Sequence, residues 1–119
     1  MDFKTNKPIY QQIVDLCFSK ILTKEWRTEE RIPSVRELAA LLMVNPHTVL
    51  KAFEFLQAEE IIYPKRGMGF FLAKDAINKV LKIQKKEFFE TTLRETFSAM
   101  DLLGISINEV LDRYVNRKK

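Results

Sequence analysis

The side chains best suited to binding chemistry in this 119-residue chain are those of His47, Thr48 and Lys51. At this spacing an imidazole, a hydroxyl and an ammonium fall on one side of a helix, where they can bond to base edges and phosphates. Two further cations, Lys65 and Arg66, lie beside a glycine-containing turn. Both sets predict contact with nucleic acid. Polar residues are also ordinary in a first helical turn, so a purely structural role stays open.

Catalytic and metal chemistry find little support in the sequence. His47 and Cys17 are the only histidine and the only cysteine, too few ligands for a zinc site. No acid/base pair and no nucleophile with its base can be recognised, so we expect no enzyme, no cofactor and no metal. Cys17 falls on an apolar helical stripe, where a buried residue is expected rather than a reactive thiol. Gly67-Met68-Gly69 follows no βαβ pattern and opens no helix, which argues against a dinucleotide site.

The elements that would position His47, Thr48 and Lys51 are two short helices around a tight turn, over residues 33–56. Ser34 and Glu37 form a capping box at the first helix start, and Asn45 followed by Pro46 marks the second. So brief a connection predicts a helix-turn-helix, whose second helix is the one placed in the major groove of DNA. The residues expected to face inward are Leu38, Ala39, Leu41 and Leu42 from the first helix and Val49, Ala52, Phe53 and Leu56 from the second. Arg36 is expected to project from the first turn.

A further helix and a hairpin are predicted on either side of this pair. Apolar residues recur at helical spacing over residues 8–22, and Trp26 in the connection that follows is expected to close the core edge. Two β-prone runs, 61–63 and 70–72, flank a turn that carries Lys65, Arg66 and Gly67. A hairpin directly after a helix-turn-helix makes a winged helix, and its basic tip can reach phosphates or the minor groove.

The rest of the chain is expected to be helical, over residues 76–103 and 107–116. Gly104 is a helix stop, and Ser106 with Glu109 forms a second capping box. Two such helices cannot build a core alone, so their apolar faces need a partner. We expect a second copy and hence a homodimer through the C-terminal helices. Folding back onto the winged helix stays open, and so short a segment makes a small-molecule effector pocket unlikely.

Composition agrees with a small cytoplasmic protein. Twenty basic and sixteen acidic side chains give a net charge of +4, compatible with nucleic acid but not decisive. A single cysteine permits no internal disulfide, and no apolar run spans a bilayer. The predicted fold is therefore mainly α with a small β-hairpin. A winged helix-turn-helix DNA-binding domain over 1–75 precedes a two-helix dimerisation region over 76–119.

With these parts in place, the chain resembles the GntR family of bacterial transcription regulators. The matching residues are Pro33-Ser34, Arg36-Glu37-Leu38-Ala39, Val44-Asn45-Pro46, Thr48-Val49, Ala52-Phe53, Leu56, Arg66-Gly67, Gly69 and Phe71, with Pro8 to Ile13 similar to the family's first helix. The short helical tail is similar to that of the YtrA-like subfamily.

The resemblance implies DNA contacts at Arg36, at Asn45, His47 and Thr48, and at Arg66 with Gly67. Lys51 and Lys65 join them from the helix face and the hairpin tip. Met43, Glu60, Glu25 and Glu30 stand where the family commonly has glycine. Because a left-handed backbone costs a non-glycine residue roughly 1 kcal/mol or more, we expect these residues to avoid it, or the turns to be shaped differently.

The function predicted from the sequence is that of a homodimeric regulator, a repressor, acting on an inverted-repeat operator in double-stranded DNA. Winged helices also serve as protein-binding adaptors, and this alternative stays open. The two differ in one observable property, since only a DNA binder loses affinity for DNA steeply as salt rises.

Overall fold

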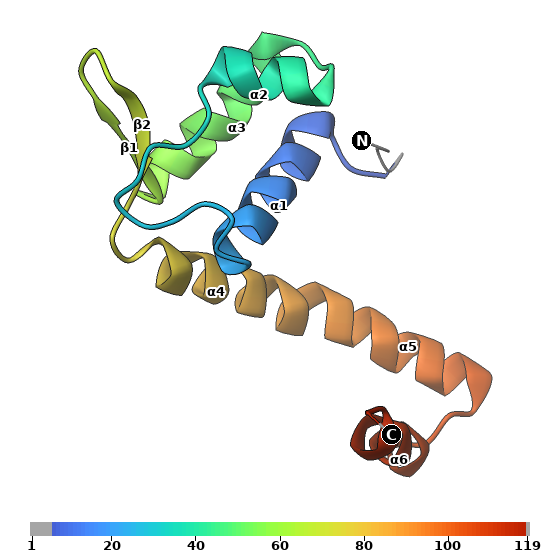
Figure 1. Cartoon of the computed structure of the whole chain (residues 1–119). Coiled ribbons are helices and arrows are strands. Elements are labelled where there is room, and N and C mark those ends of the chain that lie inside the picture. The colour runs from blue at the N-terminus through green and yellow to red at the C-terminus, as the bar shows by residue number, and fades with distance from the viewer. Residues whose placement is uncertain (1–5, 119) are drawn as a thin grey trace. The chain divides into compact units, whose positions relative to one another are not determined.

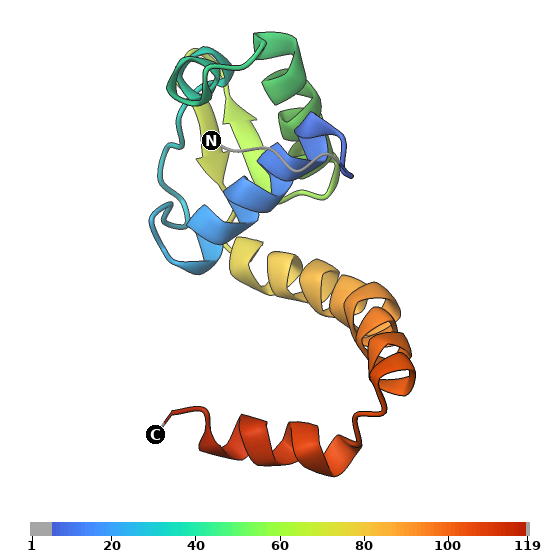
Figure 2. The same ribbon diagram turned by 90° about the vertical axis from the view of Figure 1, so that its right-hand side faces the viewer.

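The computed structural model describes residues 6–118, and the chain divides into two compact units, Met1–Lys82 and Ile83–Lys119. The expected boundary after Asp75 falls at the start of a helix whose first two turns belong to the first unit. The elements are α1 (Ile9–Leu22), α2 (Val35–Leu42), α3 (Pro46–Ala58), β1 (Ile62–Lys65), β2 (Gly69–Leu72), α4 (Ala76–Glu87), α5 (Leu93–Leu103) and α6 (Ile107–Asn116). Figure 1 shows this order, and Figure 2 shows the ribbon from a second side.

The first unit is a winged helix built on α3. Helices α1 and α2 both pack against α3, which also contacts β1. The core side chains include Ile13, Cys17, Ile21, Val49, Phe53 and Leu56. Trp26 is buried as expected, but Leu41 is 74% exposed, so its predicted place on the inner face of α2 is wrong. An eight-residue helix offers few inward positions, and Leu38 and Ala39 occupy them.

The predicted caps of α2 and α3 are confirmed. The Ser34 hydroxyl accepts the Glu37 N–H at 3.1 Å, while the Glu37 carboxylate accepts the Ser34 N–H at 3.1 Å. At α3 the Asn45 side-chain oxygen accepts the His47 N–H at 2.8 Å, and Pro46 follows as the first helical residue. Each cap satisfies a backbone donor that the helix itself leaves unpaired.

Met43 and Glu60 adopt the left-handed conformation, with φ of 56° and 59°, so the expectation that they avoid it is wrong. Both follow a helix whose end is closed by two hydrogen bonds in the same pattern. The Met43 and Val44 N–H groups donate to the Ala40 and Ala39 carbonyls at 3.3 and 3.1 Å. After α3 the Glu60 and Ile61 N–H groups donate to the Gln57 and Leu56 carbonyls, each at 2.9 Å. These Schellman bonds offset the steric cost of a side chain at a position that suits glycine.

Glu25 and Glu30 are not left-handed; the described residues with positive φ in that connection are their neighbours Lys24 (64°) and Glu29 (65°). In this connection each left-handed residue therefore lies one position before the residue where the family commonly has glycine.

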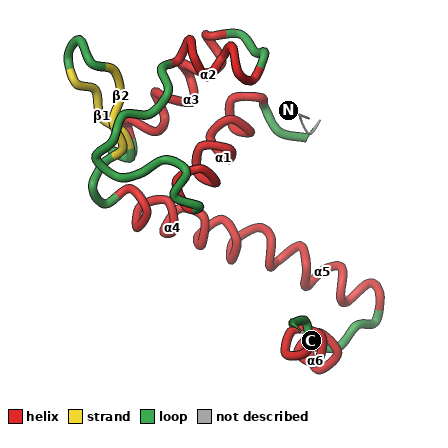
Figure 3. The backbone as a smooth tube through the Cα atoms, in the orientation of Figure 1, coloured by secondary structure: helices red, strands yellow, loops and turns green. Residues whose placement is uncertain are grey.

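The predicted hairpin is confirmed, and it forms the wing, defined here as residues 62–72. Its antiparallel register pairs Ile62 with Leu72 and Lys65 with Gly69. All strands among residues 6–118 lie in this hairpin (Figure 3). The other edge of β2 is also paired, because the Ile32 N–H donates to the Phe70 carbonyl at 3.0 Å and a bridge joins Arg31 to Phe71. The wing is thus fixed along β2 to the chain that leads into α2.

The C-terminal tail is helical over residues 76–103 as predicted, with one irregular turn. A π-helical turn, Phe88–Thr92, separates α4 from α5. The predicted stop is confirmed, since Gly104 has φ of 68° and the Ile105 N–H donates to the Met100 carbonyl at 2.9 Å. The capping box of Ser106 and Glu109 at α6 is also present. Within residues 6–118, the helices are too short or too polar to cross a membrane.

Candidate nucleic-acid interface

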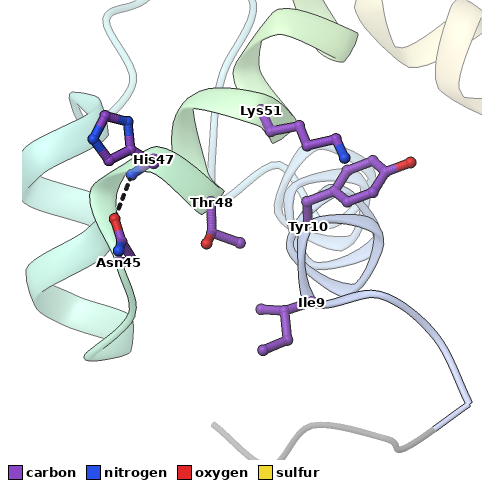
Figure 4. A pocket seen from close by; sticks show the side chains of 6 residues that line it. All are labelled: Ile9, Tyr10, Asn45, His47, Thr48 and Lys51. Atoms are coloured by element: carbon purple, nitrogen blue, oxygen red, sulfur yellow. Dashed lines mark hydrogen bonds between the residues drawn. The ribbon is translucent and has the colours of Figure 1, made fainter.

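The start of α3 borders a surface hollow of about 360 Å³ (Figure 4). Its lining combines the beginning of α3 with the beginning of α1: Ile9, Tyr10, Asn45, His47, Thr48 and Lys51. The four residues predicted from α3 therefore gather at one site. Hydroxyl, imidazole, amide and ammonium groups in one hollow can donate several hydrogen bonds to an anionic or polar ligand.

Asn45 holds the start of α3 in place. Its side-chain oxygen is engaged by the His47 N–H, which leaves its amide nitrogen free of the capping role. His47 is exposed, and in Figure 4 its imidazole points away from Tyr10. The first turn of the helix thus presents donors in two directions.

Lys51 reaches from α3 across to α1. Its Nζ lies 4.0 Å from the centre of the Tyr10 ring, close enough for a cation–π interaction (Figure 4). The ring therefore holds the ammonium at the α1 side of the hollow, while the charge remains at the surface. Helical spacing over residues 8–22 predicts neither the contact of Tyr10 with Lys51 nor the place of Ile9.

The remaining predicted residues lie outside the hollow, on α2 and on the wing. Arg36 is exposed in the first turn of α2. Lys65, Arg66 and Gly67 are exposed at the wing tip, where Gly67 has φ of 76°. The Lys65 Nζ lies 4.2 Å from the centre of the Phe71 ring, so the wing carries its own cation–π pair. The first unit thus offers cations on three separate elements.

Comparison with known proteins decides the family. Residues 9–72 match the family described as bacterial regulatory proteins, gntR family. The chain belongs to the GntR family. The match begins with α1 and ends with β2, and so covers the whole winged helix. The predicted resemblance is confirmed.

Curated relatives of this GntR protein include two regulators from Bacillus subtilis (strain 168). The HTH-type transcriptional regulator YhcF is 32% identical over 110 residues, which cover 92% of this chain and 89% of YhcF. The HTH-type transcriptional repressor YtrA is 38% identical over 80 residues, which cover 64% of this chain and 58% of YtrA. The GntR protein is accordingly a DNA-binding transcriptional regulator and not an enzyme.

Solved structures show the same fold. A GntR family transcriptional regulator from Listeria monocytogenes aligns with a TM-score of 0.78 at 35% identity, covering 97% of this chain and 98% of that one. The DNA-binding domain of AraR in complex with operator ORR3 aligns with a TM-score of 0.55 at 27% identity, covering 61% of this chain and 88% of that one. The first of these matches includes the C-terminal helices as well as the winged helix.

Proposed function

We propose that this regulator is a cytoplasmic repressor that binds an inverted-repeat operator as a homodimer. The observation that carries the proposal is the hollow at the start of α3, where the exposed side chains of His47 and Lys51 lie beside Thr48. The N-terminal end of a recognition helix is the part that contacts base edges in the major groove. Donors concentrated there suit the acceptors that bases and phosphates present.

Arg36 and the wing extend the proposed contact beyond α3. Arg36 is exposed on α2 and suits the bidentate recognition of a guanine or of a phosphate. Lys65 and Arg66 at the wing tip suit phosphates or the minor groove. In a two-fold dimer the two copies of α3 would enter successive major grooves about 34 Å apart, which requires an inverted repeat.

The repressor role is taken from a relative. YtrA of Bacillus subtilis is named a transcriptional repressor, and the AraR structure is a complex with operator DNA. Occlusion of a promoter by a bound dimer needs no further activity from the chain. Repression is therefore the simplest output of a small regulator built from a winged helix and a helical tail.

The dimer is supported by the surface of the second unit. None of residues 83–118 is buried, although α5 and α6 carry many large apolar side chains. The large apolar side chains exposed by more than a third in residues 83–118 are Phe88, Phe89, Phe97, Leu102, Leu103, Ile105, Ile107, Val110, Leu111, Tyr114 and Val115. Exposed apolar side chains in this number mark an interaction site, and the same surface of a second copy is the partner that a two-fold dimer would supply.

Fluorescence polarisation with DNA from the protein's own promoter, read across a salt series, tests DNA binding. The candidate cations Arg36, Lys51, Lys65 and Arg66 number four per copy and therefore eight in a dimer. Neutralising that many phosphates predicts that affinity falls roughly ten-thousandfold between about 50 and 200 mM salt. Equal affinity for scrambled DNA would reject sequence-specific recognition, and no affinity even at low salt would favour a protein-binding adaptor instead.

Sedimentation equilibrium tests the dimer separately. The wild-type chain should sediment as a dimer at micromolar concentration, and Leu111→Asp, in the middle of the apolar face of α6, should shift it to a monomer. Asn108→Asp is the matched control, because it places the same charge on an exposed polar position of α6 and should leave the dimer intact. A wild-type monomer would remove the role assigned to residues 76–119.

A further inference from the structure

Arg31 joins the wing to α2 through a single side chain. Its Nε donates to the Met68 carbonyl at the wing tip at 3.1 Å, and its Nη2 donates to the Glu37 carboxylate at 2.9 Å. Met68 lies between β1 and β2, whereas Glu37 lies in the first turn of α2. The planar guanidinium therefore joins two elements that are far apart in the sequence.

The Glu37 end of this bridge is held by further hydrogen bonds. The carboxylate oxygen that receives Arg31 also accepts the Ser34 N–H at 3.1 Å, and the Glu37 N–H returns a hydrogen bond to the Ser34 hydroxyl. The Ser34 N–H, followed by the Arg31 side chain, holds the pKa of Glu37 below its ordinary value of 4.5. Arg31 is thus anchored to a carboxylate that cannot turn without opening the capping box.

The wing end of the bridge depends on Gly69. This residue has φ of 98°, and a Cβ added to it would lie 3.3 Å from the Arg31 Nε. A side chain at position 69 would press against the guanidinium and strain the backbone. The backbone of Arg31 is meanwhile fixed to β2 by the bridge to Phe71. The Arg31 backbone is therefore held beside Phe71 of β2, while its side chain extends to Met68 at the wing tip.

We propose that Arg31 is a positioning residue that fixes the wing against α2 before DNA is bound. The proposal rests on the proposed function, because its consequence is that Arg66 and Arg36 meet one duplex in a preset arrangement. Backbone pairing with β2 already holds the base of the wing, so without the Arg31 side chain it is the wing tip that would have to be ordered during binding. Arg31 acts on affinity through the wing and does not contact the operator.

A double-mutant cycle separates positioning from direct contact. Arg31→Met keeps an unbranched side chain but removes the guanidinium donors, and it should weaken operator binding roughly five- to tenfold. In a chain that already carries Lys65→Ala and Arg66→Ala, the same change should cost about twofold or less, because the wing contact is already lost. Arg27→Met, at an exposed arginine of the same connection, is the matched control and should leave affinity unchanged. Additive losses, or no loss from Arg31→Met alone, would overturn the proposal.

Hydrogen exchange without DNA gives a second measurement that does not depend on the operator. The Met68 N–H donates to the Lys65 carbonyl at 2.9 Å across the wing tip, and it should exchange several-fold faster in Arg31→Met. Glu37→Gln keeps the capping box while removing the charge that anchors Arg31, so it should accelerate the same amide. Amides in the middle of α3 report that the fold is intact. An unchanged Met68 amide would overturn the proposal, whereas a wild-type chain without operator affinity would reject only the proposed function.

Discussion

Lys51 and Tyr10 join the recognition helix α3 to α1, with the Lys51 Nζ 4.0 Å from the centre of the Tyr10 ring. The contact places a positive charge at the α1 side of the hollow, over the Tyr10 ring, rather than at the tip of the helix. A cation held there is suited to the DNA backbone, whereas His47 and Thr48 are closer to the helix start.

Lys51→Gln should weaken binding to operator and to non-operator DNA by similar factors. Because each copy loses one phosphate contact, the slope of log affinity against log salt should fall by about one per copy. Tyr10→Leu should reproduce part of this loss, while Tyr10→Phe, which keeps the ring, should not. Polarisation over a salt series measures all three variants. A loss confined to the operator would place Lys51 on the bases instead.

Arg36→Ala and Thr48→Ala should weaken operator binding selectively. A lost base contact costs roughly 1–3 kcal/mol at each half-site, while binding to non-operator DNA changes less. Arg36 and Thr48 lie in the first turns of α2 and α3 and are not part of the buried core, so the thermal midpoint and the dimer should be unaffected. Gln57→Ala, at an exposed position in the last turn of α3, serves as the control. Unchanged operator affinity at moderate salt would refute these assignments.

Met43→Gly should stabilise the folded chain. Met43 has φ of 56° and its side chain is 92% exposed, so glycine relieves strain without loss of packing. The gain in unfolding free energy should approach about 1 kcal/mol, reduced by the greater freedom of glycine in the unfolded state. Urea denaturation at one fixed protein concentration measures it.

Gly104→Ala is the converse of this change, because Gly104 also has positive φ, and it should destabilise the chain. Stabilisation by Gly104→Ala, or destabilisation by Met43→Gly, would contradict the strain argument.

Acidification should weaken the start of α2 through Glu37. Its pKa lies below the ordinary value of 4.5, first because of the hydrogen bond from the Ser34 N–H and then because of Arg31. The carboxylate therefore contributes stability that is present above pH 4.5 and is lost as the pH falls through its lowered pKa.

Glu37→Gln removes this titration but retains a capping side chain. The difference in thermal midpoint between wild type and Glu37→Gln should accordingly shrink between about pH 7 and about pH 3. A difference that stays constant over this range would show that the charge of Glu37 is not involved.

Cys17 should be inert to alkylating reagents in the folded chain. The side chain is fully buried, and burial raises the pKa of the thiol from 9.0 to about 12. Because the thiolate is the reactive form, labelling at neutral pH should require unfolding. Labelling rates with and without urea measure this, and rapid modification of the folded chain would contradict the core position.

The local elements of the protein were determined by the sequence alone. Ser34 with Glu37, Asn45 with Pro46, and Ser106 with Glu109 place helix starts, because a cap is satisfied by side chains within a few residues of the backbone it serves. The wing follows in the same way from two β-prone runs around a glycine-containing turn. The grouping of Asn45, His47, Thr48 and Lys51 at one site also follows from helical spacing.

The relationships that connect distant segments were decided only by the tertiary structure. Arg31 meets Met68, which lies 37 residues away, and Tyr10 meets Lys51 because α1 packs against α3. Sequence periodicity cannot show such contacts, because it describes one helix at a time and not the neighbour against which it packs. For the same reason Leu41 is exposed although its residue type predicted burial.

Met43 shows how the two levels combine. Its residue type argues against a left-handed backbone, yet the paired bonds from the Met43 and Val44 N–H groups hold it there at the end of α2. A cost of roughly 1 kcal/mol at one residue is smaller than what the packing of α2 and α3 on a shared core provides. Local propensity therefore determines where the helices begin, and the packing between them determines the turn that joins them.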